Sequence, residues 1–103
     1  MPKGYVIITE AISDPAGMAA YGRAAAASIA ESGAKVLAAD PRPRLLEGEW
    51  HGDQTVVLEF PSAEAARAWY ESASYEKAKP LRQAAAECRV VIVSGFEMPT
   101  PGD

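Results

Sequence analysis

The 103-residue sequence predicts a single α+β domain: a four-stranded antiparallel sheet with helices on one of its faces. Strand-like and helix-like segments follow one another in the order β-α-β-β-α-β, which is the ferredoxin-like pattern of two split βαβ units. The length is typical of one domain, and the hydrophobic fraction of 49% is enough for a core. We expect residues 1–95 to form this domain. Residues 96–103, with two prolines and one glycine, are expected to form a loose tail.

The first half of the chain supplies a strand, a helix and a weaker strand. Residues 5–10 are short, β-branched and aromatic, as strands are. Asp14 and Pro15 suit the N-cap and first turn of a helix, and Gly33 suits its C-terminal stop. Residues 34–39 predict the second strand. The apolar side of the intervening helix carries Met18, Tyr21, Ala25 and Ile29 at spacings of three and four.

The middle of the chain predicts a hairpin loop followed by the clearest strand. Residues 47–53 place Trp50 and His51 among two glycines and several acidic residues, which is typical of a loop. Residues 54–60 then alternate, with one set of side chains on each face of a strand.

The last part of the chain predicts two helical segments and a strand. Ser62 is a favourable N-cap for the first segment. Ser74 is expected to cap a second segment over residues 75–87, which Pro80 should kink or divide. Residues 89–94 predict the final strand.

Two of the predicted strands are apolar on both faces. Residues 5–8 and 90–93 are almost entirely apolar, so each presents apolar side chains to both sides of the sheet. The helices cover one side, and the chain contains nothing further to cover the other. A second copy of the chain is the simplest cover, and the sequence therefore predicts a homodimer.

Composition excludes several classes of function. The net charge of −4 is unfavourable for binding nucleic acid, and no apolar stretch is long enough to span a membrane. A single cysteine, Cys88, rules out an internal disulfide and suits a reducing compartment, so we expect a cytoplasmic protein. One histidine and one cysteine are too few for a zinc site, and we expect neither a metal nor a cofactor.

Specific motifs give the chain a family resemblance. It resembles family 1330 of the domains of unknown function, within the dimeric α/β-barrel superfamily, and the resemblance extends from about Lys3 to Ser94. It implies a ferredoxin-like protomer whose sheets pair in a dimer. The insert Arg42-Pro43-Arg44 departs from the family pattern. The supporting segments are Lys3-Gly4-Tyr5, Asp14-Pro15, Tyr21, Gly33, Leu46-Glu47-Gly48-Glu49-Trp50, Val57-Leu58-Glu59-Phe60-Pro61-Ser62, Ala65-Ala66-Arg67-Ala68-Trp69-Tyr70, Ser74-Tyr75 and Leu81-Arg82.

The resemblance does not decide an activity. The superfamily includes cofactor-free monooxygenases, muconolactone-isomerase-like enzymes, dye-decolorising haem peroxidases and non-enzymatic binders, so the fold leaves the function open.

Glu59 and His51 are the candidate catalytic residues. Glu59 alternates away from the side chains expected to face the helices, which directs it into the space between paired sheets. Desolvation there would raise the pKa of its carboxyl group toward the range of a general acid or base. The alternative is a solvated or arginine-paired glutamate. The histidine side chain has an ordinary pKa near neutrality, which suits a catalytic role for His51, but a lone histidine on a glycine-flanked loop more often faces solvent.

Arg82 is the leading candidate for ligand binding. Its guanidinium group suits a substrate carboxylate, although an ion pair with a nearby glutamate is the alternative. Trp50 is expected to cover the pocket or to pack on the partner protomer. Tyr21 and Trp69 fit the core as well as they fit a site. The aromatic residues that could line a ligand site are Tyr5, Tyr21, Trp69 and Tyr75.

These observations predict a pocket between the helices and the sheet, near Glu59 and Arg82 and covered by the Trp50 loop. Two functions stay open. The first is a cofactor-independent enzyme acting on a small organic acid or aromatic compound, and the second is a non-catalytic dimer that binds a small ligand or has a structural role. Haem binding is a third option, which would need His51 as the axial ligand.

Overall fold

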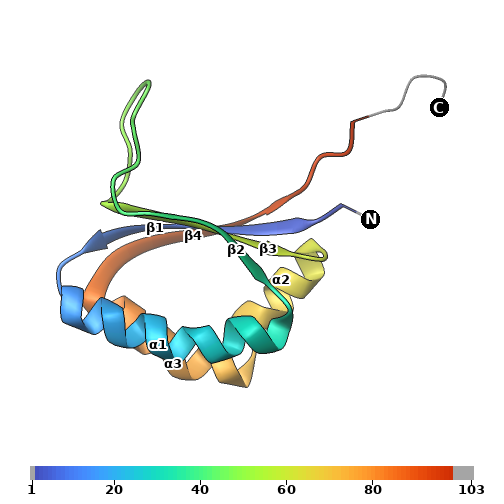
Figure 1. Ribbon diagram of the computed structural model, residues 1–103, viewed down its shortest axis with the longest axis horizontal. Coiled ribbons are helices and arrows are strands. Elements are labelled where there is room, and N and C mark those ends of the chain that lie inside the picture. Colours follow the sequence, from blue (N-terminus) through green and yellow to red (C-terminus); the bar gives the residue numbers. More distant parts are fainter. Residues whose placement is uncertain (1, 99–103) are drawn as a thin grey trace.

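The structure, a computed structural model, describes residues 2–98. One four-stranded sheet is covered on one face by three helices (Figure 1). In chain order the elements are β1 (Gly4–Ile12), α1 (Pro15–Ser32), β2 (Lys35–Asp40), β3 (Gln54–Phe60), α2 (Ala63–Tyr70), α3 (Ala73–Ala85) and β4 (Ala86–Ser94).

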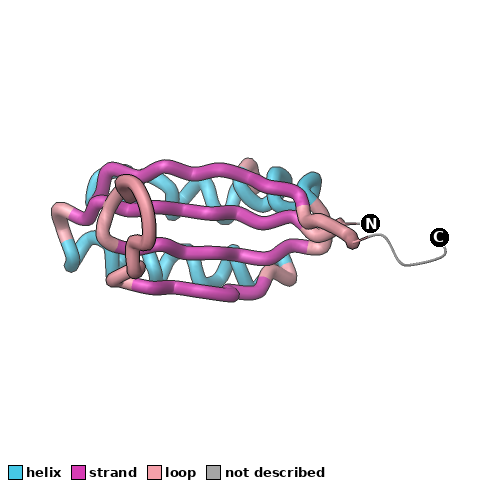
Figure 2. Tube along the Cα trace, turned by 90° about the horizontal axis from the view of Figure 1, so that it is seen from above, coloured by secondary structure: helices cyan, strands magenta, loops and turns pink. Residues whose placement is uncertain are grey.

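The predicted fold class is confirmed. The strands lie in the order β2-β3-β1-β4 and every neighbouring pair is antiparallel. Seen from above, the strands lie side by side in front of the helices (Figure 2). The central strand β1 pairs with β3 on one side and β4 on the other, so β2 and β4 are the edges of the sheet.

The second crossover differs from the prediction in its boundaries. Helix α3 is capped by Ser72 rather than Ser74, and the Ser72 hydroxyl accepts the Tyr75 backbone N–H over 3.2 Å. The helix continues through Pro80 as one element instead of two. Its buried face, which includes Ala78 and Ala85, packs on the rest of the core, and this packing offsets the hydrogen bond lost at the proline. Strand β4 consequently begins three residues earlier than expected.

The core lies between the sheet and the helices. On β1 the side chains of Val6 and Ile8 point toward the helices and are fully or almost fully buried. Leu58 and Phe60 of β3 are buried in the same layer, where the Phe60 ring packs against Trp69.

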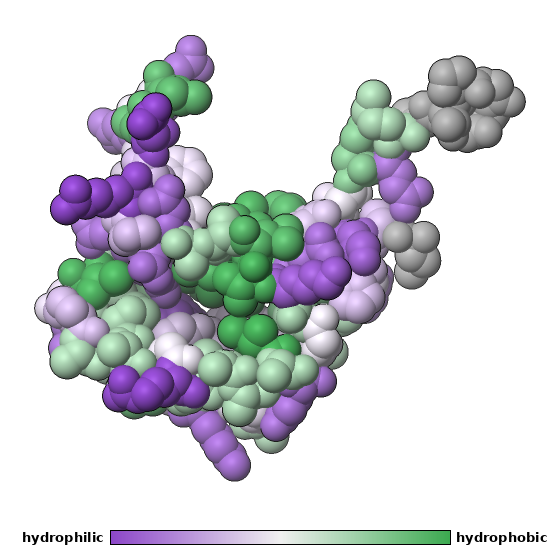
Figure 3. Space-filling model, viewed as in Figure 1, coloured by the Kyte–Doolittle hydropathy of each residue, from purple (hydrophilic) through white to green (hydrophobic). Residues whose placement is uncertain are grey.

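The loop between β2 and β3 projects on the side of the sheet away from the helices (Figure 1). Its base is fastened to β1, because the Asp53 backbone N–H donates to the Glu10 carbonyl over 2.7 Å and the Ile12 N–H donates to Asp53 Oδ2 over 3.0 Å. The chain after β4 projects on the same side, with hydrophobic surface between the two projections (Figure 3). The expectation that the Trp50 loop covers a pocket on the helical side is therefore wrong.

Residues 95–98 form neither helix nor strand, and the remainder of the predicted tail, residues 99–103, lies outside the described residues. No helix in the described part of the chain is long and apolar enough to cross a membrane.

Candidate functional site

Three polar side chains form a row across the helical face of the sheet. Gln54, Glu10 and Cys88 are register partners on the adjacent strands β3, β1 and β4. The amide Nε2 of Gln54 donates a hydrogen bond of 2.9 Å to Glu10 Oε1. Glu10 is only 1% exposed, so a carboxyl group occupies a position in the middle of the core layer.

The helices contribute a second set of polar groups to the same layer. The Tyr21 and Tyr75 hydroxyls are 2.8 Å apart, and Arg82 Nε donates to the Tyr75 hydroxyl over 3.2 Å. Tyr75 is completely buried and Arg82 is 3% exposed. Tyr21 on α1 is thereby connected through Tyr75 to a buried positive charge on α3.

Together these side chains form what we call the polar centre: Glu10, Gln54, Cys88, Tyr21, Tyr75 and Arg82. Burial changes the pKa values of several of them. Desolvation raises the pKa of Glu10, against the Gln54 hydrogen bond and the Arg82 charge, which lower it. Desolvation likewise raises the pKa of Tyr21, which stays a neutral hydrogen-bond donor. Burial opposes the charge on Arg82, but its contacts with the Cys88 thiol and the Tyr75 hydroxyl hold its pKa above the ordinary value.

A small cavity reaches the polar centre from the side of α1. Its volume is about 160 Å³, and the polar side chains in its wall are Glu10, Tyr21 and Gln54. A mostly apolar lining with a few convergent polar groups is typical of a small-molecule site, and the volume of this cavity is below the roughly 300–1,000 Å³ of most such sites, which restricts it to a small ligand. The rest of the lining is apolar: Ile8, Met18, Gly22, Ala25, Ile29, Val36, Val56 and Leu58.

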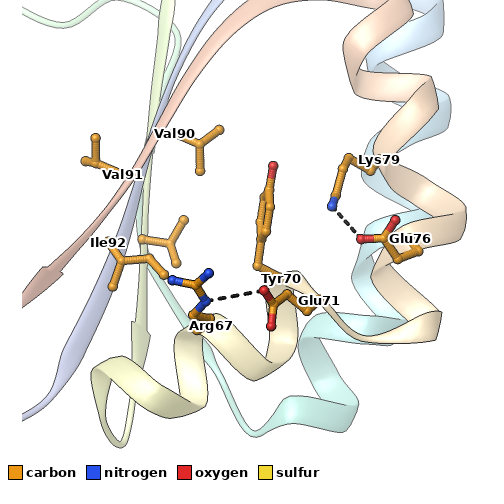
Figure 4. Close-up of a pocket in the computed structure, with 9 residues that line it drawn as sticks. Arg67, Tyr70, Glu71, Glu76, Lys79, Val90, Val91 and Ile92 are labelled. Atoms are coloured by element: carbon orange, nitrogen blue, oxygen red, sulfur yellow. Dashed lines mark hydrogen bonds and ion pairs between the residues drawn. The ribbon is translucent and has the colours of Figure 1, made fainter.

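A larger groove runs between β4 and the helices α2 and α3 (Figure 4). One section, of about 590 Å³, has Val90 and Ile92 on one wall and Lys79 on the other, and the Tyr70 side chain points into the space between them. A second section, of about 310 Å³, shares Tyr70 and Val90 with the first and reaches Arg82. The polar centre is thus approached from two sides.

The predicted site residues separate into two groups. Tyr21, Trp69, Tyr75 and Arg82 lie together in the core, where the Trp69 and Tyr75 ring centroids are 4.1 Å apart. The Trp69 indole N–H donates to the Ser28 hydroxyl over 3.2 Å, which satisfies its polar atom.

Glu59 and Tyr5 lie on the opposite face of the sheet. They are register partners, and Glu59 forms an ion pair of 3.9 Å with Lys3. Glu59 therefore does point away from the helices, as predicted. The expectation that it shares a pocket with Arg82 is wrong, because the sheet separates the two side chains.

His51 and Trp50 lie at the base of the projecting loop. His51 Nδ1 is 2.7 Å from the Thr9 hydroxyl, and its Nε2 is 3.5 Å from a carboxylate oxygen of Glu87. Trp50 is 53% exposed and donates its indole N–H to Thr55. Within the described residues no group of His, Cys, Asp or Glu side chains is arranged to hold a metal ion.

Glu10 was not predicted as a site residue. The sequence did contain a signal for it, the two-residue alternation of the strand. Glu10 follows Val6 and Ile8 at intervals of two, so a strand that buries both of these also buries the carboxyl group. Its place at the expected end of the strand hid this signal.

The sequence model of the family described as Domain of unknown function (DUF1330) matches residues 3–96. The chain belongs to this family. No curated protein matches the chain.

Solved structures with the same fold include proteins with and without an assigned activity. A protein of unknown function from Rhodopseudomonas palustris is 22% identical, with a TM-score of 0.74 over 94% of this chain and 85% of that one. A cofactor-independent oxygenase from Streptomyces nogalater is 10% identical, with a TM-score of 0.67 over the whole of both chains. A dimeric protein of unknown function with a ferredoxin-like fold, from Bacteroides fragilis, is 13% identical, with a TM-score of 0.61 over 89% of this chain and 95% of that one. At these identities the similarity shows the fold alone.

Proposed function

We propose that the protein is a cofactor-independent enzyme that removes a proton from a small organic acid or aromatic compound bound in the cavity beside α1. The observation that supports this most directly is the placement of Glu10. A carboxyl group that is 1% exposed, with its pKa raised by burial, lies in the wall of a largely apolar cavity. These are the conditions in which a carboxylate acts as a general base near neutral pH.

The proposed mechanism uses Glu10 and Tyr21, which line one cavity, and two groups behind them. The Glu10 carboxylate takes a proton from a carbon next to a carbonyl group, and the electron pair of that C–H bond moves onto the carbonyl oxygen as an enolate. The Tyr21 hydroxyl, which shares the cavity wall with Glu10, donates a hydrogen bond to that oxygen. Arg82 strengthens this donor through Tyr75, whose hydroxyl accepts from Arg82 and is free to donate its own hydrogen to Tyr21 in the 2.8 Å contact between the two hydroxyls. The proton on Glu10 exchanges with solvent, and Glu10 then returns a solvent-derived proton to the carbon as the enolate collapses to the carbonyl compound.

Phenylpyruvate tests the proposal, because it is a single-ring organic acid with an acidic C–H bond. We expect the protein to accelerate exchange of its C3 hydrogens with D₂O above the rate in buffer, measured by proton NMR. Glu10→Gln should abolish the acceleration. Tyr21→Phe should reduce it about 100-fold, the usual cost of losing one oxyanion donor. Dioxygen uptake with the same compound separates an oxygenase, the activity in the name of the Streptomyces nogalater protein, from a proton-transfer enzyme.

Glu59 and His51 are the competing proton acceptors. Glu59→Gln and His51→Gln enter the same assay as controls on the opposite face of the sheet. Loss of exchange with Glu59→Gln but not with Glu10→Gln would move the chemistry to that face and contradict the proposal. Binding of phenylpyruvate without exchange would support the alternative, a non-catalytic ligand-binding protein.

We also propose that the protein acts as a homodimer through the sheet face opposite the helices, which we call the open face. Ile7 and Val57 on the central strands carry apolar side chains on this face, and Val91 and Val93 of β4 are 51% and 40% exposed. A monomer would leave this apolar surface in water. The Bacteroides fragilis protein, which is described as dimeric, supports a homodimer without indicating which face forms it.

A further inference from the structure

The charges that line the groove between β4 and the helices are balanced, with one exception. Arg67 pairs with Glu71 over 3.3 Å, and Lys79 pairs with Glu76 (Figure 4). Arg82 lines the adjoining section of the groove, and among the described residues no carboxylate oxygen lies within 4.0 Å of its guanidinium group. Two cations of the groove thus form ion pairs with neighbouring carboxylates, and the third, Arg82, forms none among the described residues.

The unpaired cation is also the most deeply buried of the three. Arg82 is 3% exposed, whereas the Arg67 side chain is 72% exposed. A buried charge is costly unless a counter-ion compensates it. The Arg82 Nε–H donates to the Tyr75 hydroxyl and a further contact goes to the Cys88 thiol, and neither of these partners is a carboxylate. Arg82 therefore has no ion-pair partner among the described residues, and the Glu10 carboxyl group, with which its charge interacts, lies beyond ion-pair distance.

The surface leading away from Arg82 is apolar and elongated. The two sections share Tyr70 and Val90, so the groove continues from Arg82 along β4 to Ile92. Val6 adds to its apolar lining, and the Tyr70 ring stands beside this wall with Lys79 Nζ 3.9 Å from the ring centroid. The section volumes of about 590 and 310 Å³ fall within the range of small-molecule sites, roughly 300–1,000 Å³.

We infer that this groove binds an elongated monocarboxylate, with the carboxylate on Arg82 and the apolar body along Val90, Ile92 and Tyr70. The inference goes beyond the proposed proton transfer and does not depend on it, since the groove and the Glu10 cavity lie on different sides of the polar centre. A guanidinium group matches a carboxylate in charge and in hydrogen-bonding geometry, and the apolar wall favours an alkyl or aryl chain over a second charge.

Octanoate is the probe, with 1-octanol as a matched compound of the same chain length that lacks the charge. We expect octanoate to bind, by isothermal titration calorimetry, at least tenfold more tightly than 1-octanol, which is the order of magnitude of one charge-assisted hydrogen bond. In an amide NMR titration the shifts should concentrate on β4, α2 and α3 rather than on β2.

Substitutions assign the binding to the groove. Arg82→Gln should weaken octanoate binding about tenfold or more and leave 1-octanol binding unchanged. Arg89→Gln is the matched control, because Arg89 lies on the same strand as Val90 but is exposed on the open face. If Arg82→Gln does not fold, Ile92→Glu tests the same groove, since Ile92 lies in the groove wall and is 38% exposed, so the substitution is compatible with folding. It should weaken octanoate binding, whereas Leu81→Glu on the outer side of α3 should not.

Equal binding of octanoate and 1-octanol, absence of octanoate binding at millimolar concentration, or equal effects of Arg82→Gln and Arg89→Gln would each overturn the inference. Octanoate binding without phenylpyruvate exchange would leave the groove site standing and remove the proposed activity. Phenylpyruvate exchange without octanoate binding would support the proposed activity and overturn the groove site.

Discussion

Gln54 Nε2 donates to Glu10 Oε1 over 2.9 Å, and this hydrogen bond joins two neighbouring strands inside the layer that otherwise forms the hydrophobic core. An amide donor favours the ionised carboxylate, whereas the surrounding apolar groups disfavour it, and burial has the larger effect on the pKa of Glu10. The Gln54 hydrogen bond therefore opposes, without cancelling, the effect of burial on the Glu10 carboxyl group.

Glu10→Gln should change how stability depends on pH. Because the folded protein has a raised pKa for Glu10, the protonated carboxyl contributes stability below its ordinary pKa of 4.5, and this contribution is lost as the pH rises through the folded value. The free energy of unfolding of the wild type should thus fall relative to that of the variant as the pH rises above 4.5, by about 1.4 kcal/mol for each unit by which the pKa is raised. Urea unfolding at a series of pH values measures this difference. Glu64→Gln on the surface of α2 is the control for loss of one carboxylate, and a pH-independent difference for Glu10→Gln would contradict the assignment.

Tyr75→Phe should cost more stability than Tyr21→Phe. The Tyr75 hydroxyl bonds both Tyr21 and Arg82, so its removal leaves a buried cationic donor without this acceptor, at about 2–3 kcal/mol. Tyr21→Phe removes one neutral hydrogen bond, at about 1 kcal/mol. Since the two hydroxyls share a bond, the double variant should lose less than the sum of the two single losses in urea unfolding. Strict additivity would show that the hydroxyls are not coupled.

Gly52→Ala should destabilise the protein more than Gly48→Ala. Both glycines have positive φ, 80° and 77° respectively, so alanine is strained at either position. At Gly52 a Cβ would also lie 2.5 Å from the backbone of Glu10, whereas at Gly48 it meets open space. We expect a cost of about 1 kcal/mol at Gly48 and at least about 2 kcal/mol at Gly52, measured by thermal or urea unfolding. Equal costs would mean that the loop base is not held against β1.

Val93→Glu should convert the protein from a dimer to a monomer. Val93 pairs with Tyr5 on the open face, and a charge there would be desolvated when two such faces meet. Sedimentation velocity at micromolar concentration should show a dimer for the wild type and for Leu81→Glu, which carries the same new charge on the outer side of α3. A wild type that sediments as a monomer would contradict the homodimer proposal.

The strands, the helices and the helical core positions follow from local pattern. The strand composition of residues 5–10, the alternation of residues 54–60, the Asp14 cap and the Gly33 stop each depend on neighbours close in sequence, and the structure confirms all of them. The start of α3 did not follow, because Ser72 and Ser74 are both suitable caps. The buried side chains of the helix, Tyr75 among them, fix which serine begins it.

The sequence by itself determined the element order and the fold class. Only the tertiary structure decided on which side of the sheet each candidate lies and which of them meet. It placed Glu59 with Lys3 on the open face, and it brought Glu10 to Gln54, 44 residues away, beside a helix that carries Arg82. The physical reason is that strand alternation fixes a face for each residue only relative to its own strand. The pairing of strands and the docking of helices on one side then determine which carboxyl group is buried and desolvated.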